Sequence, residues 1–309
     1  MKNYIGLTGL KRKSIIINIM TTDDKETGSR PANSYTYYVK EAKLMPRLYL
    51  PITQIIEDQI SITGEKARYL TSVLRCREGD DLIVFDGNNN CFRTTIVQVT
   101  KKEVTVQVLE KFSFDSESPL HITLAQGLLK GEKMDMVIQK ATELGVKEIM
   151  PVITERSQVR ETRKVSRWRK IAEEASKQSG RSMIPVVHEP INFNDIFSIH
   201  SSRLTPHGLI FYEEGGMKLS EVIQKLMKHD TGYTIQDKNI INHTSCILHP
   251  ASLPVYLFIG PEGGFTKEEV TLAKEKGLLI ISFGKRILRA ETAAISAVTL
   301  VQFLLGDMG

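Results

Sequence analysis

The chain is poor in cysteine and has no long apolar run. Its 309 residues include three cysteines, an odd number at wide spacing, which favours reduced thiols over a disulfide framework. No stretch approaches the roughly 20 apolar residues that a membrane-spanning helix needs. Residues 11–20 faintly resemble a signal peptide, but Asp23 and Asp24 stand where small residues should precede a cleavage site. We therefore expect a cytoplasmic protein without a membrane partner.

Composition narrows the function only a little. Hydrophobic residues make up 41% and charged residues 25% of the chain, which is ordinary for a globular protein. The net charge of +5 is compatible with a nucleic-acid partner but does not require one. His243, Cys246 and His249 offer three possible zinc ligands and lack an obvious fourth. We expect no metal.

The N-terminal part contains two kinds of segment. Residues 1–44 are polar and lack a sustained period, so we interpret them as a disordered extension or as the product of a start codon set too far upstream. Residues 82–88, 92–99 and 104–109 read as short strands, with a turn at Lys101 and Lys102. This pattern predicts a small antiparallel barrel, followed by a linker at about 115–119.

From Leu120 onward, strands and helices alternate, which predicts an α/β fold with a parallel sheet. Apolar residues at helical spacing between 134 and 144 mark a helix that Gly145 can end. A last helix is expected from about 291 to 305, with a face of small residues that permits close packing. Residues 229–254 look like an inserted loop. The predicted strands are 122–125, 149–152, 209–212, 255–259 and 278–283.

Two strands near the C-terminus each run into a glycine-containing loop and then into a helix. Such loops side by side in an α/β sheet form a crevice for a small ligand. The first loop has no backbone donor at Pro261, and Gly263 and Gly264 can reach positive φ, so its main chain can approach a ligand closely. The second carries Arg286 and Arg289, which suit a polyanionic partner.

These loops resemble the cofactor loops of the SPOUT superfamily of RNA methyltransferases, and in particular those of the RsmE family. The resemblance covers about 45 to 305 and includes further segments at 45–50, 68–75, 78–80, 140–146, 154–157 and 174–181. It implies a trefoil-knotted parallel sheet at 120–309 and an N-terminal PUA-like, RNA-docking β-barrel at 45–115. It also implies methylation of a uridine in 16S ribosomal RNA, with S-adenosylmethionine (SAM) as cofactor and a homodimer as the assembly.

The resemblance assigns SAM binding to the two glycine loops. Their backbone groups can satisfy the adenine edge, and their apolar side chains can form its walls. The cofactor-binding residues expected on this basis are Ile259, Gly260, Pro261, Glu262, Gly263, Gly264, Phe283, Gly284, Ile287 and Leu288.

Arg289 and Glu291 are the candidate catalytic residues. Uracil N3 is a poor nucleophile until it loses its proton, so an N3-methyltransferase must favour the deprotonated imide. Arg289 can stabilise the developing charge and Glu291 can act as the base. A structural ion pair or a helix cap is the alternative interpretation of both.

Basic residues in both parts of the chain are candidates for RNA contact. A solvated surface, offset by neighbouring glutamates, is the alternative. Residues 127–133 have the wrong glycine spacing for a nucleotide-hydrolysing loop, so their lysines are expected at the mouth of the site. The expected RNA-binding residues are Arg47, Arg68, Arg75, Lys130, Lys133, Arg156 and Arg181.

The predicted function is SAM-dependent methylation of a uridine N3 in 16S rRNA, within an assembled small subunit. Ala293, Ala294 and Ala297 on the last helix are expected at the homodimer interface. One alternative is a SPOUT enzyme with another target, such as a ribose 2′-oxygen. A second is a non-catalytic RNA-binding protein, against which the intact cofactor loops argue.

Overall fold

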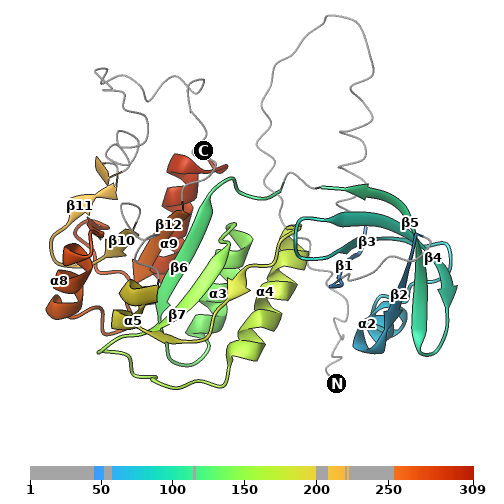
Figure 1. Ribbon diagram of the computed structural model, residues 1–309, viewed down its shortest axis with the longest axis horizontal. Helices are drawn as coiled ribbons and strands as arrows, with labels where there is room; N and C mark the ends of the chain where they lie inside the picture. The colour runs from blue at the N-terminus through green and yellow to red at the C-terminus, as the bar shows by residue number, and fades with distance from the viewer. Residues whose placement is uncertain (1–44, 52–57, 114–115, 200–207, 220, 223–253) are drawn as a thin grey trace, which may run out of the picture. The chain divides into compact units, whose positions relative to one another are not determined.

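The computed structural model describes residues 45–51, 58–113, 116–199, 208–219, 221–222 and 254–309 (Figure 1). The expectations for residues 1–44, and for all but the last residue of the loop at 229–254, lie outside the described residues. Within the described part of the chain, no helix has the length and apolar character needed to cross a membrane.

A five-stranded sheet with the order β1-β3-β4-β5-β2 forms the N-terminal part. Neighbours from β3 to β2 are antiparallel, as predicted. β1 pairs with β3 in parallel, so the sheet is mixed rather than purely antiparallel. α2 (Gly64–Arg68) and the π-helix η1 (Tyr69–Val73) follow β2. The strands are β1 (Arg47–Tyr49), β2 (Gln59–Thr63), β3 (Asp81–Phe85), β4 (Cys91–Val99) and β5 (Glu103–Phe112).

An eight-stranded sheet with the order β11-β13-β10-β12-β6-β7-β8 forms the C-terminal part, and β9 also pairs with β7. Every pairing between its described strands is parallel, which confirms the α/β prediction. The strands are β6 (His121–Gly127), β7 (Glu148–Ile153), β8 (Val186–Val187), β9 (Ile191–Asn192), β10 (Gly208–Phe211), β11 (Met217–Lys218), β12 (Pro254–Ile259) and β13 (Leu279–Ser282).

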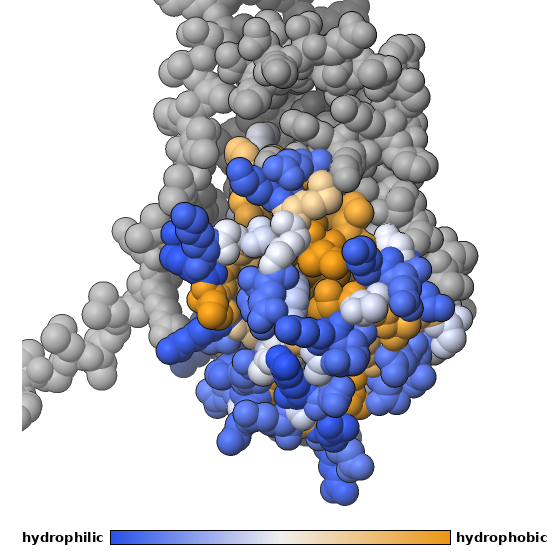
Figure 2. All heavy atoms as spheres, turned by 90° about the vertical axis from the view of Figure 1, so that its left-hand side faces the viewer, coloured by the Kyte–Doolittle hydropathy of each residue, from blue (hydrophilic) through white to orange (hydrophobic). Residues whose placement is uncertain are grey.

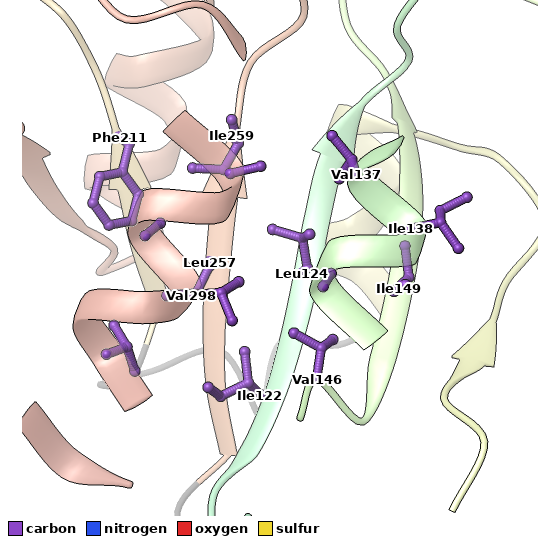
Figure 3. Packing of buried hydrophobic residues seen from close by; sticks show 14 of the residues in the cluster. Ile122, Leu124, Val137, Ile138, Val146, Ile149, Phe211, Leu257, Ile259 and Val298 are labelled. Carbon is purple, nitrogen blue, oxygen red and sulfur yellow. The ribbon is translucent and has the colours of Figure 1, made fainter. Parts of the chain in front are cut away.

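Helices cover both faces of this sheet. α3 (Lys133–Glu143), α4 (Val165–Ser179) and α9 (Ala290–Leu305) pack on one face, and α5 (Phe193–Ile199) and α8 (Lys267–Glu275) pack on the other. β12 shows why, because Leu257 and Ile259 point to the first face and Phe258 points to the second. Figure 3 shows the first core, in which Leu124, Leu257 and Val298 lie between the strands and the helices α3 and α9.

Local signals end or begin several helices as the sequence predicts. Gly145 follows α3 with a φ of 86°, a conformation that glycine adopts without strain. Thr266 and Glu269 form a capping box at the start of α8. These contacts lie within a few residues of each other, so the sequence pattern was sufficient to find them.

The strand order positions the site. β10 lies between β12 and β13, so the chain crosses β10 when it passes from β12 through α8 to β13. It then continues as α9 on the opposite face. The loops after β10, β12 and β13 therefore meet at the carboxyl edge of neighbouring parallel strands, where ligands bind in open α/β sheets.

The small-residue face of α9 belongs to the core of its own chain. Ala294 and Ala297 are 1% and 0% exposed, and they pack in the cluster that includes α3 and β12. The prediction that these two alanines form a subunit interface is therefore wrong. Ala293 also packs against this cluster and remains partly exposed. The exposed apolar residues of α9 are Leu300 and Phe303.

Candidate active site

A cavity of about 550 Å³ lies at the carboxyl ends of β10, β12 and β13. Its volume is within the range of sites for small organic ligands. Every residue expected to bind the cofactor lines it, together with Lys133, Arg289 and Glu291. The side of the molecule that carries α8 and β11 is mainly hydrophilic, with hydrophobic side chains showing between the polar ones (Figure 2). The other lining residues are Phe211, Tyr212, Glu213, Phe265, Ser282, Arg286, Ala290 and Ala293.

The first loop, residues 260–265, forms a tight turn. The Gly264 amide donates to the Pro261 carbonyl at 3.0 Å, and Gly264 has a φ of 68°. Gly263, which as a glycine could also reach positive φ, does not adopt it. Gly263 meets a spatial requirement instead, because a Cβ there would lie 3.0 Å from the Arg156 Cβ.

The end of β6 packs directly against this loop. A Cβ on Gly127 would lie 2.4 Å from the Pro261 nitrogen, so only glycine allows the two main chains to touch. The buried Gln126 side chain donates from Nε2 to the Gly260 carbonyl at 3.2 Å. The loop is thereby fixed to a central strand of the sheet.

Glu262 joins the first loop to the start of α3. Its carboxylate accepts from Lys133 Nζ at 2.9 Å and from the Lys130 amide at 3.2 Å. Burial alone would raise the pKa of Glu262, but the hydrogen bonds from Lys133 and from backbone amides outweigh it and lower the pKa. Glu262 is therefore a charged link between two segments that are far apart in sequence.

The second loop, residues 283–289, is less enclosed. Phe283 stacks on Phe211 with ring centroids 4.6 Å apart, which gives the cavity an apolar floor. Gly284 has a φ of 96°, and Ile287 is 87% exposed at the rim. Arg286 also lines the cavity.

Arg289 and Glu291 lie at the start of α9. Arg289 is the N-cap residue, but its side chain makes no capping hydrogen bond. Within the described part of the chain, no ion pair joins it to Glu291, so that alternative interpretation lacks support. Glu291 Oε2 is buried without a hydrogen-bond partner among the described residues. This oxygen therefore offers a hydrogen-bond acceptor beside the cavity.

The residues expected to bind RNA fall into different groups. Arg68, Arg75 and Lys130 are exposed. Lys133 is paired with Glu262, and Arg156 donates from Nη1 to the carbonyls of Gly263 and Phe265 at 3.0 and 3.2 Å. These two side chains are therefore engaged with the first loop.

Arg181 is a correction to the prediction. It is 3% exposed, donates to Glu117 Oε2 at 2.8 Å, and donates to the carbonyls of Thr142 and Val146. A guanidinium buried in this way cannot contact an RNA phosphate, so its assignment as an RNA-binding residue is wrong. Arg47 donates to the Arg181 carbonyl at 2.9 Å and lies over the Phe85 ring, so it too has a structural role.

Sequence reasoning missed the wall that β10 contributes. Phe211, Tyr212 and Glu213 line the cavity at the end of that strand. A signal was present, because residues 209–212 were identified as a strand and carboxyl ends of neighbouring parallel strands meet at one edge. What was lacking was the strand order, which puts β10 between β12 and β13.

Family models match both parts of the chain. An RNA methyltransferase domain matches residues 116–302, and an RNA methyltransferase PUA domain matches residues 62–109. Two relatives named ribosomal RNA small subunit methyltransferase E align over most of this chain. The one from Buchnera aphidicola is 30% identical and aligns over 86% of this chain and 96% of its own length. The one from Synechocystis is 33% identical, over 84% and 78% respectively.

Solved structures agree. A ribosomal RNA small subunit methyltransferase E from Neisseria gonorrhoeae, bound to S-adenosyl methionine, is 32% identical and superposes with a TM-score of 0.70 over 86% of this chain and all of its own. A putative methyltransferase from Legionella pneumophila, in complex with SAM, is 33% identical with a TM-score of 0.68 over 85% of this chain and 99% of its own. The chain therefore belongs to the RNA methyltransferase family of ribosomal RNA small subunit methyltransferase E, which is the RsmE family.

Proposed function

We propose that the protein transfers a methyl group from SAM to N3 of a uridine in 16S ribosomal RNA. The observation that carries the proposal is the cavity at the two glycine loops, in a chain that belongs to a family of SAM-dependent rRNA methyltransferases. The cavity combines main-chain polar groups, apolar walls and charged side chains. SAM needs all three, because it has an adenine, a ribose, an amino-acid group and a sulfonium.

The residues present fit this cofactor. Gly260 and Gly264 keep the first loop compact, and Ile259, Phe283 and Leu288 supply apolar surface for an adenine. The carboxylate of Glu291, with Oε2 unpartnered among the described residues, remains able to accept a hydrogen bond. When bound, SAM supplies an electrophilic methyl group. We assign its binding to both loops.

Arg289 and Glu291 are assigned to the target base. Glu291 accepts the N3 proton, and Arg289 stabilises the negative charge that this leaves on the uracil. Both side chains line the cavity, and among the described residues Glu291 Oε2 has no hydrogen-bond partner, which supports both assignments. The alternative of a helix cap is weakened for Arg289, whose side chain does not cap α9.

We assign RNA docking to Arg68, Arg75 and Lys130, which are exposed, and to residues 45–115 as a PUA-like domain. Residues 120–309 are assigned to a SPOUT domain with a trefoil knot. The crossing of β10 by the chain between β12 and β13, followed by α9 on the opposite face, supports the knot. We further assign the protein to the cytoplasm as a homodimer that acts on an assembled small subunit without a metal ion.

Nucleoside analysis tests the proposal. Small subunits from a strain that lacks the gene are incubated with the purified protein and SAM, and the RNA is then digested to nucleosides. We expect 3-methyluridine. A 2′-O-methyl nucleoside would favour the ribose-methylating alternative, and bound SAM without methyl transfer to any ribosomal particle would favour a non-catalytic RNA-binding protein.

A further inference from the structure

A short turn after β7 also contacts the first loop of the cavity, at residues other than those that β6 contacts. In this turn, residues 154–157, the Ser157 hydroxyl accepts from the Thr154 amide at 3.0 Å and shares a second hydrogen bond with the Thr154 hydroxyl. Both residues are buried, at 2% and 6% exposure. The turn is therefore a fixed support from which the intervening residues project.

Arg156 connects this support to the first loop. Its Nη1 donates to the carbonyls of Gly263 and Phe265, and its Cβ lies 3.0 Å from the position that a Cβ on Gly263 would take. The guanidinium spans the last residues of the loop before Thr266 begins the cap of α8. Its position thus sets the direction in which the loop enters the helix.

Glu269 makes the second connection. Its Oε1 accepts from the Glu155 amide and its Oε2 accepts from the Thr266 amide, both at 2.9 Å. The side chain is 8% exposed, which is unusual for a glutamate and is explained by these charge-assisted hydrogen bonds. One carboxylate therefore joins the turn, the end of the loop and the helix.

We propose that Arg156 and Glu269 are positioning residues that hold the first loop in its cofactor-binding conformation, through the turn at residues 154–157. The proposal rests on the proposed function, because it takes the ligand of the cavity to be SAM. It assigns Arg156 to cofactor affinity, whereas the sequence pattern assigned it to RNA phosphates. Neither residue is among those that line the cavity.

Arg156→Lys separates these two roles. Lysine keeps the positive charge that a phosphate contact needs, but it lacks the planar guanidinium, whose Nη1 donates to the carbonyls of Gly263 and Phe265. We expect the Kd for SAM, measured by calorimetry, to rise about tenfold, the effect of losing a hydrogen bond from a charged donor. The salt dependence of RNA binding should not change. Arg163→Ala is the matched control, since Arg163 is exposed on the same connection, and it should leave the Kd for SAM unchanged.

Glu269→Gln and Thr266→Ala form a second pair. Thr266→Ala removes the hydroxyl that accepts from the Glu269 amide but leaves the Glu269 carboxylate in place. Glu269→Gln leaves a single acceptor oxygen for two amides. Both variants should lower the melting temperature, because both weaken the cap of α8. Only Glu269→Gln should raise the Kd for SAM, by about tenfold.

The outcomes distinguish the positioning role of Arg156 and Glu269 from the proposed function itself. Failure of the wild-type protein to bind SAM would overturn the proposed function itself. Normal SAM affinity in both Arg156→Lys and Glu269→Gln, with wild-type binding intact, would overturn the positioning role alone. Unchanged SAM affinity in Arg156→Lys, together with weaker RNA binding in Arg156→Ala, would return Arg156 to the RNA contacts. Circular dichroism at the assay temperature establishes that each variant is folded.

Discussion

The two loops of the cavity are held in different ways. The first, residues 260–265, receives hydrogen bonds from β6, from Arg156 and from the start of α3. In the second, residues 283–289, no described hydrogen bond or ion pair engages the side chains of Lys285, Arg286 or Arg289. Its described contacts include the Phe283 stack and a bond from the Gly284 amide to Ser282 Oγ at 3.1 Å.

This difference indicates a division of roles. A loop that its own chain holds in place is preorganised, so a ligand loses little free energy in ordering it. A loop with unengaged guanidinium groups can direct them to a substrate. We therefore expect substitutions in the supports of the first loop to change cofactor affinity, and substitutions of the arginines of the second loop, Arg286 and Arg289, to change turnover.

Arg289→Ala tests the second loop most severely. Its side chain lines the cavity and makes no hydrogen bond or ion pair with a described residue, so we expect kcat to fall by about 100-fold to 1,000-fold, as when a charge-stabilising donor is removed from an active site. The Kd for SAM should change by no more than about twofold. Lys285→Ala, outside the cavity lining, is the control and should retain activity. Loss of SAM affinity equal to the loss of kcat would contradict the division between the loops.

Glu291→Gln should lower kcat by about 100-fold, within the range for loss of a general base. The variant keeps the size and polarity of the side chain but cannot take a proton at neutral pH. Its rate should therefore recover as the pH approaches the pKa of the uracil imide. A pH–rate profile of single-turnover methylation measures this. A profile parallel to that of the wild type would show that Glu291 is not the base.

Gly127→Ala and Gly284→Ala compare the close packing of the first loop with that of the second. Gly127 ends β6 and contacts the first loop, and Gly284 lies in the second loop. A Cβ on Gly127 would overlap the main chain of Pro261, so we expect a loss of about 2 kcal/mol in unfolding free energy and a Kd for SAM raised more than about tenfold. A Cβ on Gly284 would meet no atom within 4 Å, and its cost is limited to the strain of a φ of 96°, about 1 kcal/mol. Urea denaturation and calorimetry measure both quantities. Equal effects of the two substitutions on the unfolding free energy and on the Kd for SAM would contradict the proposed difference between the loops.

The smallest expected effect is a pH dependence of cofactor binding. The lowered pKa of Glu262 means that its link to Lys133 is complete above the ordinary carboxyl pKa and is lost as the pH falls through the lowered value. SAM affinity should therefore stay constant above the ordinary carboxyl pKa of about 4.3 and weaken only as the pH falls below it. Glu262→Gln should remove that part of the dependence. An unchanged pH profile in this variant would show that the link does not affect the cofactor.

Local patterns were sufficient where the determining contacts are local. The period of apolar residues between 134 and 144 identified α3, and the spacing of Thr266 and Glu269 identified the cap of α8. The two glycine loops were found because each follows a short apolar strand and precedes a helix. The parallel arrangement followed from the alternation of strands and helices.

Contacts between distant segments were not predictable in this way. Arg156 and Arg181 look alike in the sequence, as members of one basic run. In the structure one holds a loop of the cavity and the other is buried against Glu117. A basic residue can bind any carboxylate or carbonyl that the fold brings near it, and its neighbours in sequence do not reveal which one.

By itself, the sequence determined the five longer strands of the C-terminal sheet, the two glycine loops and the resemblance that pointed to the cofactor, but it did not indicate the two-residue strands β8, β9 and β11. The tertiary structure decided that β10 separates β12 from β13, that Phe211 and Glu213 therefore join the cavity, and that Ala294 and Ala297 are internal. The physical reason is the range of the interactions. Turns, caps and amphipathic faces depend on residues a few positions apart, whereas strand order and the accessibility of a side chain depend on packing between segments more than a hundred residues apart.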